Sequence, residues 1–352
     1  MPCLHRSTRT VLLVAALQAC RTDTSTPRPI LVAQASGTTA RLQAVSAVNP
    51  EVAWVSGVDG TYARTLDGGR TWRSGVVPGA ESLQFRDVHA VTADTAYLLS
   101  AGTGAESRIY KTADGGAIWT LQFVNDVPDA FFDCFDFWDS THGVAFSDAV
   151  GGKFIVVVTD DGEHWVPADP GALPAAQPGE GGFAASGTCV LARGHGEGWI
   201  GTGNAAPARV LRTADRGRTW TSVDVPVIAG DAAGVTSVAF WDDAVGIADG
   251  GEIGVPESTG RRVARTEDSG RSWMPAGEPS FAGAAYGAAY VPASTPPVAV
   301  AVGPGGASYS IDHGRAWIAL DTLDYWGVGF AGPEAGWLVG PGGRVVKVMF
   351  GR

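Results

Sequence analysis

Seven residues of this chain have side chains that could bind or act on a ligand at one shared surface. They comprise one arginine, four carboxylic acids and two adjacent aromatic residues, namely Arg86, Asp133, Asp136, Glu180, Glu252, Tyr325 and Trp326. Arginine binds carboxylates and phosphates, and aromatic rings stack on ligands. Two carboxyl groups at a suitable separation can also hydrolyse a glycosidic bond. The residue types therefore favour a binding surface, with a glycan-acting hydrolase or a small-ligand-binding protein as the alternative.

Most of these residues lie in or beside the longest connections of a repeating chain. The connections span residues 125–133, 167–186 and 250–262. Connections between regular elements carry a large share of binding residues, so we expect the seven side chains to line a surface near a central channel. We assign none of them a catalytic role.

A short motif, T/S-x-D-x-G-x-x-W, recurs six times at intervals of 44 to 55 residues. Its short polar side chains can bond nearby backbone N–H groups, its Gly accepts a positive φ, and its Trp buries a large apolar face. In the third copy we place Val158 at the Thr position. We expect six structural turns, whose aspartates are Asp67, Asp114, Asp160, Asp215, Asp268 and Asp312.

A second pattern, upstream of each motif, divides every unit into four strands. Its anchor positions follow an apolar residue by nine positions and are Trp54, Tyr97, Val144, Trp199, Ile247 and Trp337. In the first unit the expected strands are 42–48, 52–57, 62–66 and 72–77, each of ordinary length. The sixth unit is less regular, and we place its second strand at 298–302.

A seventh unit begins at Tyr325 and has only three expected strands, the third at 344–349, with no turn motif. Residues 30–35 precede the first unit and can supply the missing strand. Pairing of this strand with the last unit would close a ring and remove an exposed sheet edge. The sequence therefore predicts an all-β fold, a seven-bladed β-propeller of four-stranded antiparallel blades over residues 30–352.

The N-terminus has the composition of an export signal. A basic start and a short apolar stretch end at Leu17-Gln18-Ala19-Cys20, which resembles a bacterial lipobox. We expect a signal peptide at 1–19, lipidation of Cys20 and a tether at 20–29. The protein would then be a membrane-anchored lipoprotein facing the periplasm or cell surface. Simple secretion without a lipid is the alternative.

Two further cysteines, Cys134 and Cys189, occupy equivalent positions in neighbouring units. Equivalent side chains in adjacent blades are expected to point the same way around the ring, so we expect two buried free thiols. A disulfide in an oxidising compartment is the alternative. No Cys or His spacing indicates a metal site.

The charge and the motifs limit the possible partners. The chain has a net charge of −11 and no basic stripe, which opposes binding to nucleic acid. It has no dinucleotide fingerprint and no haem-attachment motif, so we expect no cofactor. We expect a monomeric propeller that binds a protein partner and contacts the membrane only through its lipid anchor.

The recurring motif resembles the Asp-box, or BNR, repeat of sialidases and many other propellers. In that family the box is a structural element placed away from the active site. A sialidase would also carry a Phe-Arg-Ile-Pro signature, which is absent here.

The phrase Arg-Thr-x-Asp-Gly-Gly-x-Thr-Trp, with Gly-Trp-x-x-Gly before it, is similar to the photosystem II stability and assembly factor family of seven-bladed propellers. The resemblance covers residues 38–350, and the insert at 173–188 looks closer to exported bacterial relatives of that family. Members that assist assembly bind a protein partner through an arginine-rich patch, and this acidic sequence shows no such patch. The resemblance implies a protein-interaction or assembly module.

Overall fold

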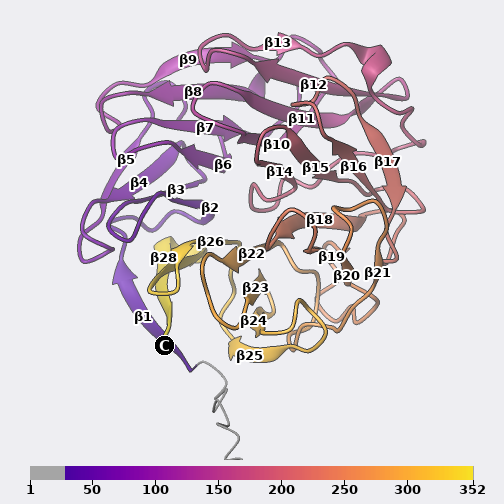
Figure 1. Cartoon of the computed structure of the whole chain (residues 1–352). Coiled ribbons are helices and arrows are strands. Elements are labelled where there is room, and N and C mark those ends of the chain that lie inside the picture. Colours follow the sequence, from indigo (N-terminus) through magenta and orange to yellow (C-terminus); the bar gives the residue numbers. More distant parts are fainter. Residues whose placement is uncertain (1–27, 352) are drawn as a thin grey trace, which may run out of the picture.

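Seven four-stranded antiparallel sheets surround a central channel in the computed structural model, which describes residues 28–351. Figure 1 shows the sheets following one another around the ring in chain order, from indigo to yellow. The predicted seven-bladed β-propeller is therefore confirmed. The expected signal peptide, Cys20 and the tether up to residue 27 lie outside the described residues.

The first strand of each blade lies nearest the channel. These inner strands are β2 (Leu42–Ala47), β6 (Phe85–Ala90), β10 (Phe132–Phe137), β14 (Val190–Arg193), β18 (Ala233–Phe240), β22 (Gly287–Val291) and β26 (Gly327–Gly332). The second strands are β3 (Ala53–Gly57), β7 (Ala96–Ser100), β11 (Gly143–Val150), β15 (Glu197–Gly201), β19 (Gly246–Glu252), β23 (Val298–Gly303) and β27 (Ala335–Gly340). The predicted second strand of the irregular sixth unit is thus confirmed.

The third and fourth strands complete each blade toward its outer edge. The third strands are β4 (Thr61–Thr65), β8 (Arg108–Thr112), β12 (Lys153–Thr159), β16 (Arg209–Thr213), β20 (Val263–Thr266), β24 (Gly306–Ser310) and β28 (Arg344–Phe350). The outer strands are β5 (Arg73–Val76), β9 (Thr120–Val124), β13 (Val166–Pro167), β17 (Thr221–Asp224), β21 (Met274–Pro275), β25 (Ile318–Asp321) and β1 (Pro29–Ala35). Three single 3-10 turns interrupt the connections, η1 (Gly104–Glu106), η2 (Pro170–Ala172) and η3 (Pro341–Gly343).

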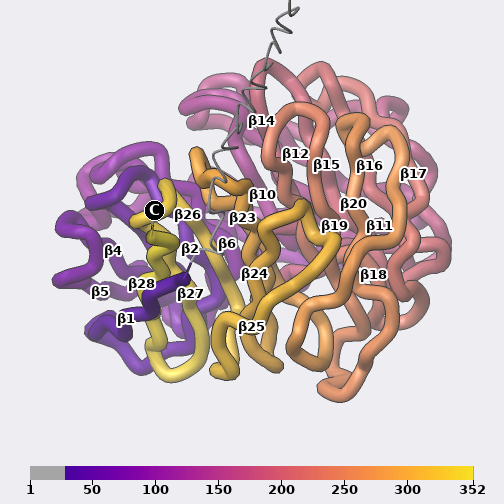
Figure 2. The backbone as a smooth tube through the Cα atoms, turned by 60° about the horizontal axis from the view of Figure 1, so that its bottom comes forward, coloured from indigo at the N-terminus to yellow at the C-terminus, as the bar shows by residue number. Residues whose placement is uncertain are grey.

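The N-terminal strand closes the ring, as the sequence predicts. β1 pairs antiparallel with β28 from Pro29 opposite Phe350 to Ala35 opposite Arg344. Figure 2 shows indigo β1 beside yellow β28. Because the last blade takes its outer strand from the start of the chain, neither end of the ring leaves an unpaired sheet edge.

The hydrophobic core lies between neighbouring blades. The predicted anchors of the second strands are completely buried, including Trp54, Tyr97, Trp199 and Trp337. The polar groups of Trp54, Tyr97 and Trp199 donate to backbone carbonyls of the next blade, as Tyr97 Oη does to the Gly162 carbonyl at 2.9 Å. An anchor thus buries apolar surface and satisfies its own polar group at the same contact.

The recurrent turns connect the third and outer strands of six blades. In the first, the Thr65 hydroxyl donates to Asp67 Oδ1 at 3.0 Å and accepts from the Gly69 N–H at 2.8 Å. The Asp67 carboxylate also accepts from the backbone N–H and the hydroxyl of Thr71. These hydrogen bonds from Thr71 lower the pKa of Asp67 to about 2. The aspartate therefore holds the turn closed, as expected from its position in the motif.

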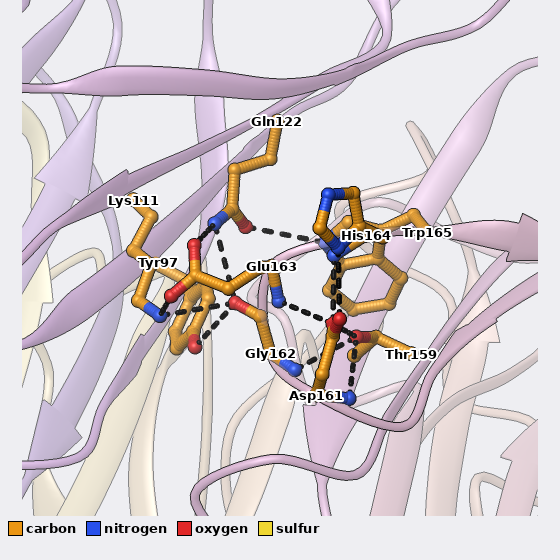
Figure 3. Close-up of polar contacts among 9 residues, drawn as sticks. All are labelled: Tyr97, Lys111, Gln122, Thr159, Asp161, Gly162, Glu163, His164 and Trp165. Carbon is orange, nitrogen blue, oxygen red and sulfur yellow. Dashed lines mark hydrogen bonds and ion pairs between the residues drawn. The ribbon is translucent and has the colours of Figure 1, made fainter.

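The third turn differs from the expected assignment, in which Val158 and Asp160 hold the connection. Thr159 and Asp161 form it instead, because the copy is shorter by one residue: the Gly162 N–H donates to Thr159 Oγ1 at 2.9 Å and the His164 N–H donates to Asp161 at 2.8 Å. Figure 3 shows this turn and the donors from blade 2 that bind the Gly162 carbonyl. The side chain of Asp160 is 82% exposed.

Cys134 and Cys189 form a disulfide, which corrects the expectation of two free thiols. Inner strands converge toward the channel axis, so side chains at this position reach the next blade, as Asp87 does when it accepts from the Phe135 N–H at 2.8 Å. The two cysteine Cα atoms lie 5.9 Å apart, inside the range of a disulfide. Side chains at equivalent positions in adjacent blades therefore meet near the axis.

Among the described residues, no helix has the length and apolar character needed to cross a membrane.

Candidate binding site at the channel mouth

The channel has two different ends. Inner strands begin on the face that carries the long insertions, which we call the mouth face, and they end on the face of the six recurrent turns, the turn face. At the start of an inner strand a β-bulge interrupts the ladder at Gln43, Arg86, Asp133 and Thr236. A bulge re-aims the extra side chain. Arg86 and Asp133 therefore leave the regular alternation of their strands.

Residues 181–188, which we call the plug, cross the channel below the mouth face. The Ala184 carbonyl accepts from Arg86 of blade 2 at 2.8 Å, and the Ser186 hydroxyl donates to the Tyr286 carbonyl of blade 6 at 2.7 Å. Gly187 has φ +80°, and a Cβ there would lie 2.2 Å from Asp87 Oδ1, so only glycine fits. The insertion between blades 3 and 4 thus separates the two ends of the channel.

Glu180 holds the start of the plug and does not line an open surface as expected. Its side chain is 1% exposed and forms an ion pair with Arg209. The carboxylate also accepts from the Thr202 hydroxyl at 2.7 Å and from the Gln177 N–H at 2.8 Å. The Cys134–Cys189 disulfide follows directly after the plug, so both ends of this segment are fixed.

Asp133 is also buried rather than part of an open binding face. Burial and the neighbouring carboxyl of Asp148 raise the pKa of Asp133 well above its ordinary value. Burial raises the pKa of Asp148 to about 6, and this residue accepts from the Gly182 N–H at 2.8 Å. The two carboxyl groups are close enough under the plug for each to change the pKa of the other.

Two arginines and two aromatic rings meet at the mouth, and we call Arg41, Arg86, Tyr286 and Trp326 the mouth cluster. The guanidinium carbons of Arg41 and Arg86 lie 4.5 and 5.8 Å from the centre of the Trp326 ring. The Tyr286 ring meets Trp326 edge-on, with centres 5.1 Å apart. The four side chains come from four parts of the ring: Arg41 from the segment before blade 1, Arg86 from blade 2, Tyr286 from blade 6 and Trp326 from blade 7.

The two arginines differ in the number of hydrogen bonds that their guanidinium groups make within the protein. Arg86 donates to the Ala184 carbonyl and to Gln84 Oε1 at 3.0 Å. Arg41 is half-buried, and no hydrogen bond or ion pair with any of residues 28–351 satisfies its guanidinium. Burial, together with the positive charge of Arg41, lowers the pKa of Arg86. Two cations therefore share one ring, and neither forms an ion pair with a carboxylate of residues 28–351.

Of the two remaining residues near this face, Tyr325 lies in the core and Glu252 lies beside the mouth cluster. Tyr325 is completely buried and donates to Asp321 Oδ2 at 2.6 Å, so it belongs to the core between blades 6 and 7 and not to the mouth. Glu252 is half-buried and lines a hollow of about 300 Å³ that reaches Tyr286. The hollow continues the mouth cluster along the insertion at residues 250–262.

Asp136 lies on the far side of the plug from the mouth cluster. It accepts from His89 Nδ1 at 2.9 Å and lines a cavity of about 490 Å³, which we call the lower cavity. Ser186 and Thr188 of the plug also line this cavity. The structure thus gathers only Arg86, Trp326 and, at its edge, Glu252 from the seven predicted residues.

Sequence reasoning missed Arg41 and Tyr286. Tyr286 stands two residues before Ala288, as Arg86 and Trp326 stand two residues before the apolar residues of their inner strands. That register would have indicated Tyr286 if the sixth unit had been regular. Arg41 immediately precedes β2, the inner strand of blade 1, and no linear pattern marks its approach to Arg86. The sequence shows no arginine-rich run because the arginines come from separate blades.

Within residues 28–351, no group of three or more His, Cys, Asp or Glu side chains could hold a metal ion.

Comparisons with known proteins agree with the architecture. No protein-family model and no curated protein matches the chain. YCF48 from Cyanidioschyzon merolae has a TM-score of 0.63 and 15% identity, over 91% of this chain and 98% of that one. YCF48 bound to a D1 peptide has a TM-score of 0.59 and 15% identity, over 91% and 95%.

An ancestral GH74 enzyme has a TM-score of 0.57 and 13% identity, over 84% of this chain and 40% of that one. At such identities structural likeness shows the fold alone. The chain is a seven-bladed β-propeller with the same overall fold as YCF48.

Proposed function

We propose that this protein is an exported, lipid-anchored interaction or assembly module whose mouth cluster binds a carboxylate of a partner polypeptide. The observation that carries the proposal is the unpaired guanidinium of Arg41, 4.5 Å from the Trp326 ring centre and beside Arg86. The carboxylate would come from an acidic side chain or from the C-terminus of the partner.

A carboxylate fits the mouth cluster because it would supply the hydrogen-bond partner that Arg41 lacks and a countercharge for Arg86. The guanidinium of Arg41 forms no hydrogen bond within the described chain, and its Nε is buried, so its terminal nitrogens are the groups that a partner could reach. Guanidinium groups bind carboxylates through paired, charge-assisted hydrogen bonds. The Trp326 ring holds both groups from one side, so little side-chain freedom remains to be lost on binding.

The hollow beside Tyr286 gives the rest of a peptide a place to lie. It has walls from Val255, Pro256 and Pro304, with Glu252 and Glu257 at its acidic side. A segment with a carboxylate at the arginines and apolar or basic residues over the hollow would match both regions. The solved complex of YCF48 with a D1 peptide supports a protein partner for a propeller of this fold.

The proposed anchor would turn the mouth face away from the membrane. Outer strands run from the turn face to the mouth face, so the Pro29 end of β1 lies on the turn face. Cys20 precedes Pro29 by nine residues. Lipidation of Cys20 would therefore hold the turn face toward the bilayer and leave the mouth cluster open to a partner. We further propose that the recurrent turns are Asp-box repeats and that the propeller is a monomer.

Peptide titration tests the proposed site. One fluorescein-labelled octapeptide is prepared in four forms, with a carboxylate at the C-terminus only, at an internal Glu only, at both places, or at neither. We expect fluorescence polarisation to show binding of at least one single-carboxylate form and weaker binding of the neutral form. Comparison of the two single-carboxylate forms identifies the source of the carboxylate.

Matched variants place the binding at the mouth cluster. Arg41→Gln and Arg86→Gln are each expected to weaken binding tenfold or more, since a hydrogen bond to a charged group contributes about 1.5–3 kcal/mol. Arg261→Gln, on the exposed insertion of the same face, serves as the control and should leave binding unchanged. Equal binding of the neutral peptide, or full binding by Arg41→Gln, would refute the proposal.

A further inference from the structure

We propose that the lower cavity is a second binding site, for a small neutral and mostly apolar molecule that carries a hydroxyl group. This site is separate from the protein-binding role proposed for the mouth cluster. The lower cavity has a volume of about 490 Å³ and takes its walls from blades 1 to 6. Pockets for small ligands have volumes of roughly 300–1,000 Å³.

The plug gives the lower cavity a closed end. The Thr188 carbonyl accepts from the Val238 N–H of blade 5 at 2.9 Å, and Ser186 bonds the Tyr286 carbonyl of blade 6. Arg86 of blade 2, across the ring, holds the same segment at the Ala184 carbonyl, so a molecule entering from the turn face meets a fixed surface. The cavity is therefore a pocket that is closed at one end and does not pass through the channel.

Most of the cavity wall is apolar. Val88, Leu191 and Val238 lie along the inner strands, and Trp241 and Tyr290 lie toward the turn face. Such a wall favours an aromatic or aliphatic ring over a sugar or a phosphate, because transfer of an apolar ligand surface from water to an apolar wall lowers the free energy.

His89 provides one hydrogen-bond acceptor. Its Nδ1 donates to Asp136 at 2.9 Å, since a carboxylate can only accept. In the neutral imidazole this leaves Nε2 as an acceptor, and none of residues 28–351 donates to it. The ring is held against Phe137, with centres 4.7 Å apart, so its position in the wall is fixed.

Thr188 provides a second acceptor, as a proton count shows. The single hydroxyl proton of Ser186 is donated to the Tyr286 carbonyl. The contact of 2.8 Å between the Ser186 and Thr188 hydroxyls therefore has Thr188 as its donor. The lone pairs of Thr188 Oγ1 then remain free to accept from a ligand at the closed end of the cavity.

The charges near the cavity are already compensated. Arg193 donates to the carbonyls of Phe240 and Trp241 and lies 3.5 Å from Asp243. The carboxylate of Asp136 accepts from three donors, two of them backbone N–H groups at 2.8 Å. With its charges paired and its acceptors free, the site suits a neutral hydroxyl donor better than an ion.

At the closed end, Asp87 accepts from the Phe135 N–H at 2.8 Å, and burial raises the pKa of this carboxyl well above its ordinary value.

Binding of matched aromatic probes to the full chain tests the proposal. Saturation-transfer NMR and calorimetry would compare 2-naphthol with 2-methoxynaphthalene, which has the same ring system without the donor proton. We expect 2-naphthol to bind at least tenfold more tightly. Equal affinities, or no binding of either probe, would overturn the inference, and this comparison requires no variant to fold.

Substitutions locate the probe in the cavity. His89→Phe keeps the ring contact with Phe137 but removes the acceptor, and it should lower the preference for 2-naphthol. Ala289→Trp places a large ring in the cavity and should abolish binding of both probes. Retention of full 2-naphthol affinity in Ala289→Trp would place the probe elsewhere and refute the site. Arg41→Gln should leave probe binding unchanged, so loss of peptide binding and loss of probe binding are separable.

Discussion

Buried carboxyl groups are the most unusual single residues of this propeller. Asp249 in β19 is fully buried, and burial raises the pKa of its carboxyl to about 8 against the opposing effect of the Arg262 guanidinium. The folded state therefore binds a proton at this side chain that the unfolded chain releases at much lower pH. The contribution of this bound proton to stability is fully present below the pKa that Asp249 has in the unfolded chain, near 4, and it is lost as the pH rises toward 8.

An Asp249→Asn variant isolates this effect because the amide does not titrate. Relative to the variant, the wild type should lose about 1.4 kcal/mol of unfolding free energy for each pH unit between about 4 and 8. Urea unfolding at pH 4, 6 and 8 measures the difference. Asp160→Asn, at an exposed surface position, is the control. Parallel stability curves for wild type and Asp249→Asn would contradict the assigned protonation.

At the scale of elements, the recurrent turns link each blade to its neighbour. The Gly162 carbonyl of the third turn accepts from Tyr97 Oη at 2.9 Å and from Lys111 Nζ at 3.0 Å, both from blade 2. A turn that lost its internal hydrogen bonds would also misplace the carbonyl that the previous blade binds. We expect the turns to stabilise interfaces as well as connections.

The third turn tests this expectation and the corrected residue assignment. Thr159→Val keeps the side-chain shape but removes the hydroxyl that accepts from the Gly162 N–H, and should lower the unfolding free energy by about 1–2 kcal/mol. Asp160→Asn should leave the urea midpoint unchanged, because its side chain is largely exposed. A lower urea midpoint for Asp160→Asn together with an unchanged midpoint for Thr159→Val would show that Asp160, and not Asp161, holds the turn.

At the scale of the whole molecule, one side chain joins the two ends of the chain. Gln34 Oε1 in β1 accepts from the indole N–H groups of Trp72 in blade 1 and Trp337 in blade 7, at 3.0 and 3.1 Å. Its Nε2 lies 3.4 Å from the Gly68 carbonyl of the first turn. The ring closes through this contact as well as through the backbone pairing of β1 with β28.

Gln34→Leu should therefore weaken the closure of the ring. Two indole N–H groups in the core would lose their acceptor, and an unpaired buried donor costs about 1–3 kcal/mol. We expect a lower urea midpoint with a single transition for the whole propeller. Val32→Thr, on the exposed side of the same strand, is the control. An unchanged midpoint for Gln34→Leu would show that backbone pairing alone closes the ring.

The site was less predictable than the fold. Arg86 and Trp326 were predicted because both begin inner strands that the repeat locates. Glu180 has a charged side chain in a long connection, and only its ion pair with Arg209 shows that it is a buried structural residue. Asp136 lies one residue after the apolar position of its inner strand, whereas Arg86 lies two residues before it, and the plug separates the two side chains.

The number of blades, the four-strand unit and the closing strand could all be predicted from the sequence. The first two depend on contacts within about fifty residues, where turn chemistry and the alternation of apolar residues leave a repeated signal. The closing strand pairs with β28 at the other end of the chain, and it was predictable because the last unit lacks a fourth strand. The tertiary structure decided which side chains meet across blades, including Cys134 with Cys189 and Arg41 with Arg86. Those contacts arise because inner strands converge at the axis, and no local pattern in the chain records that convergence.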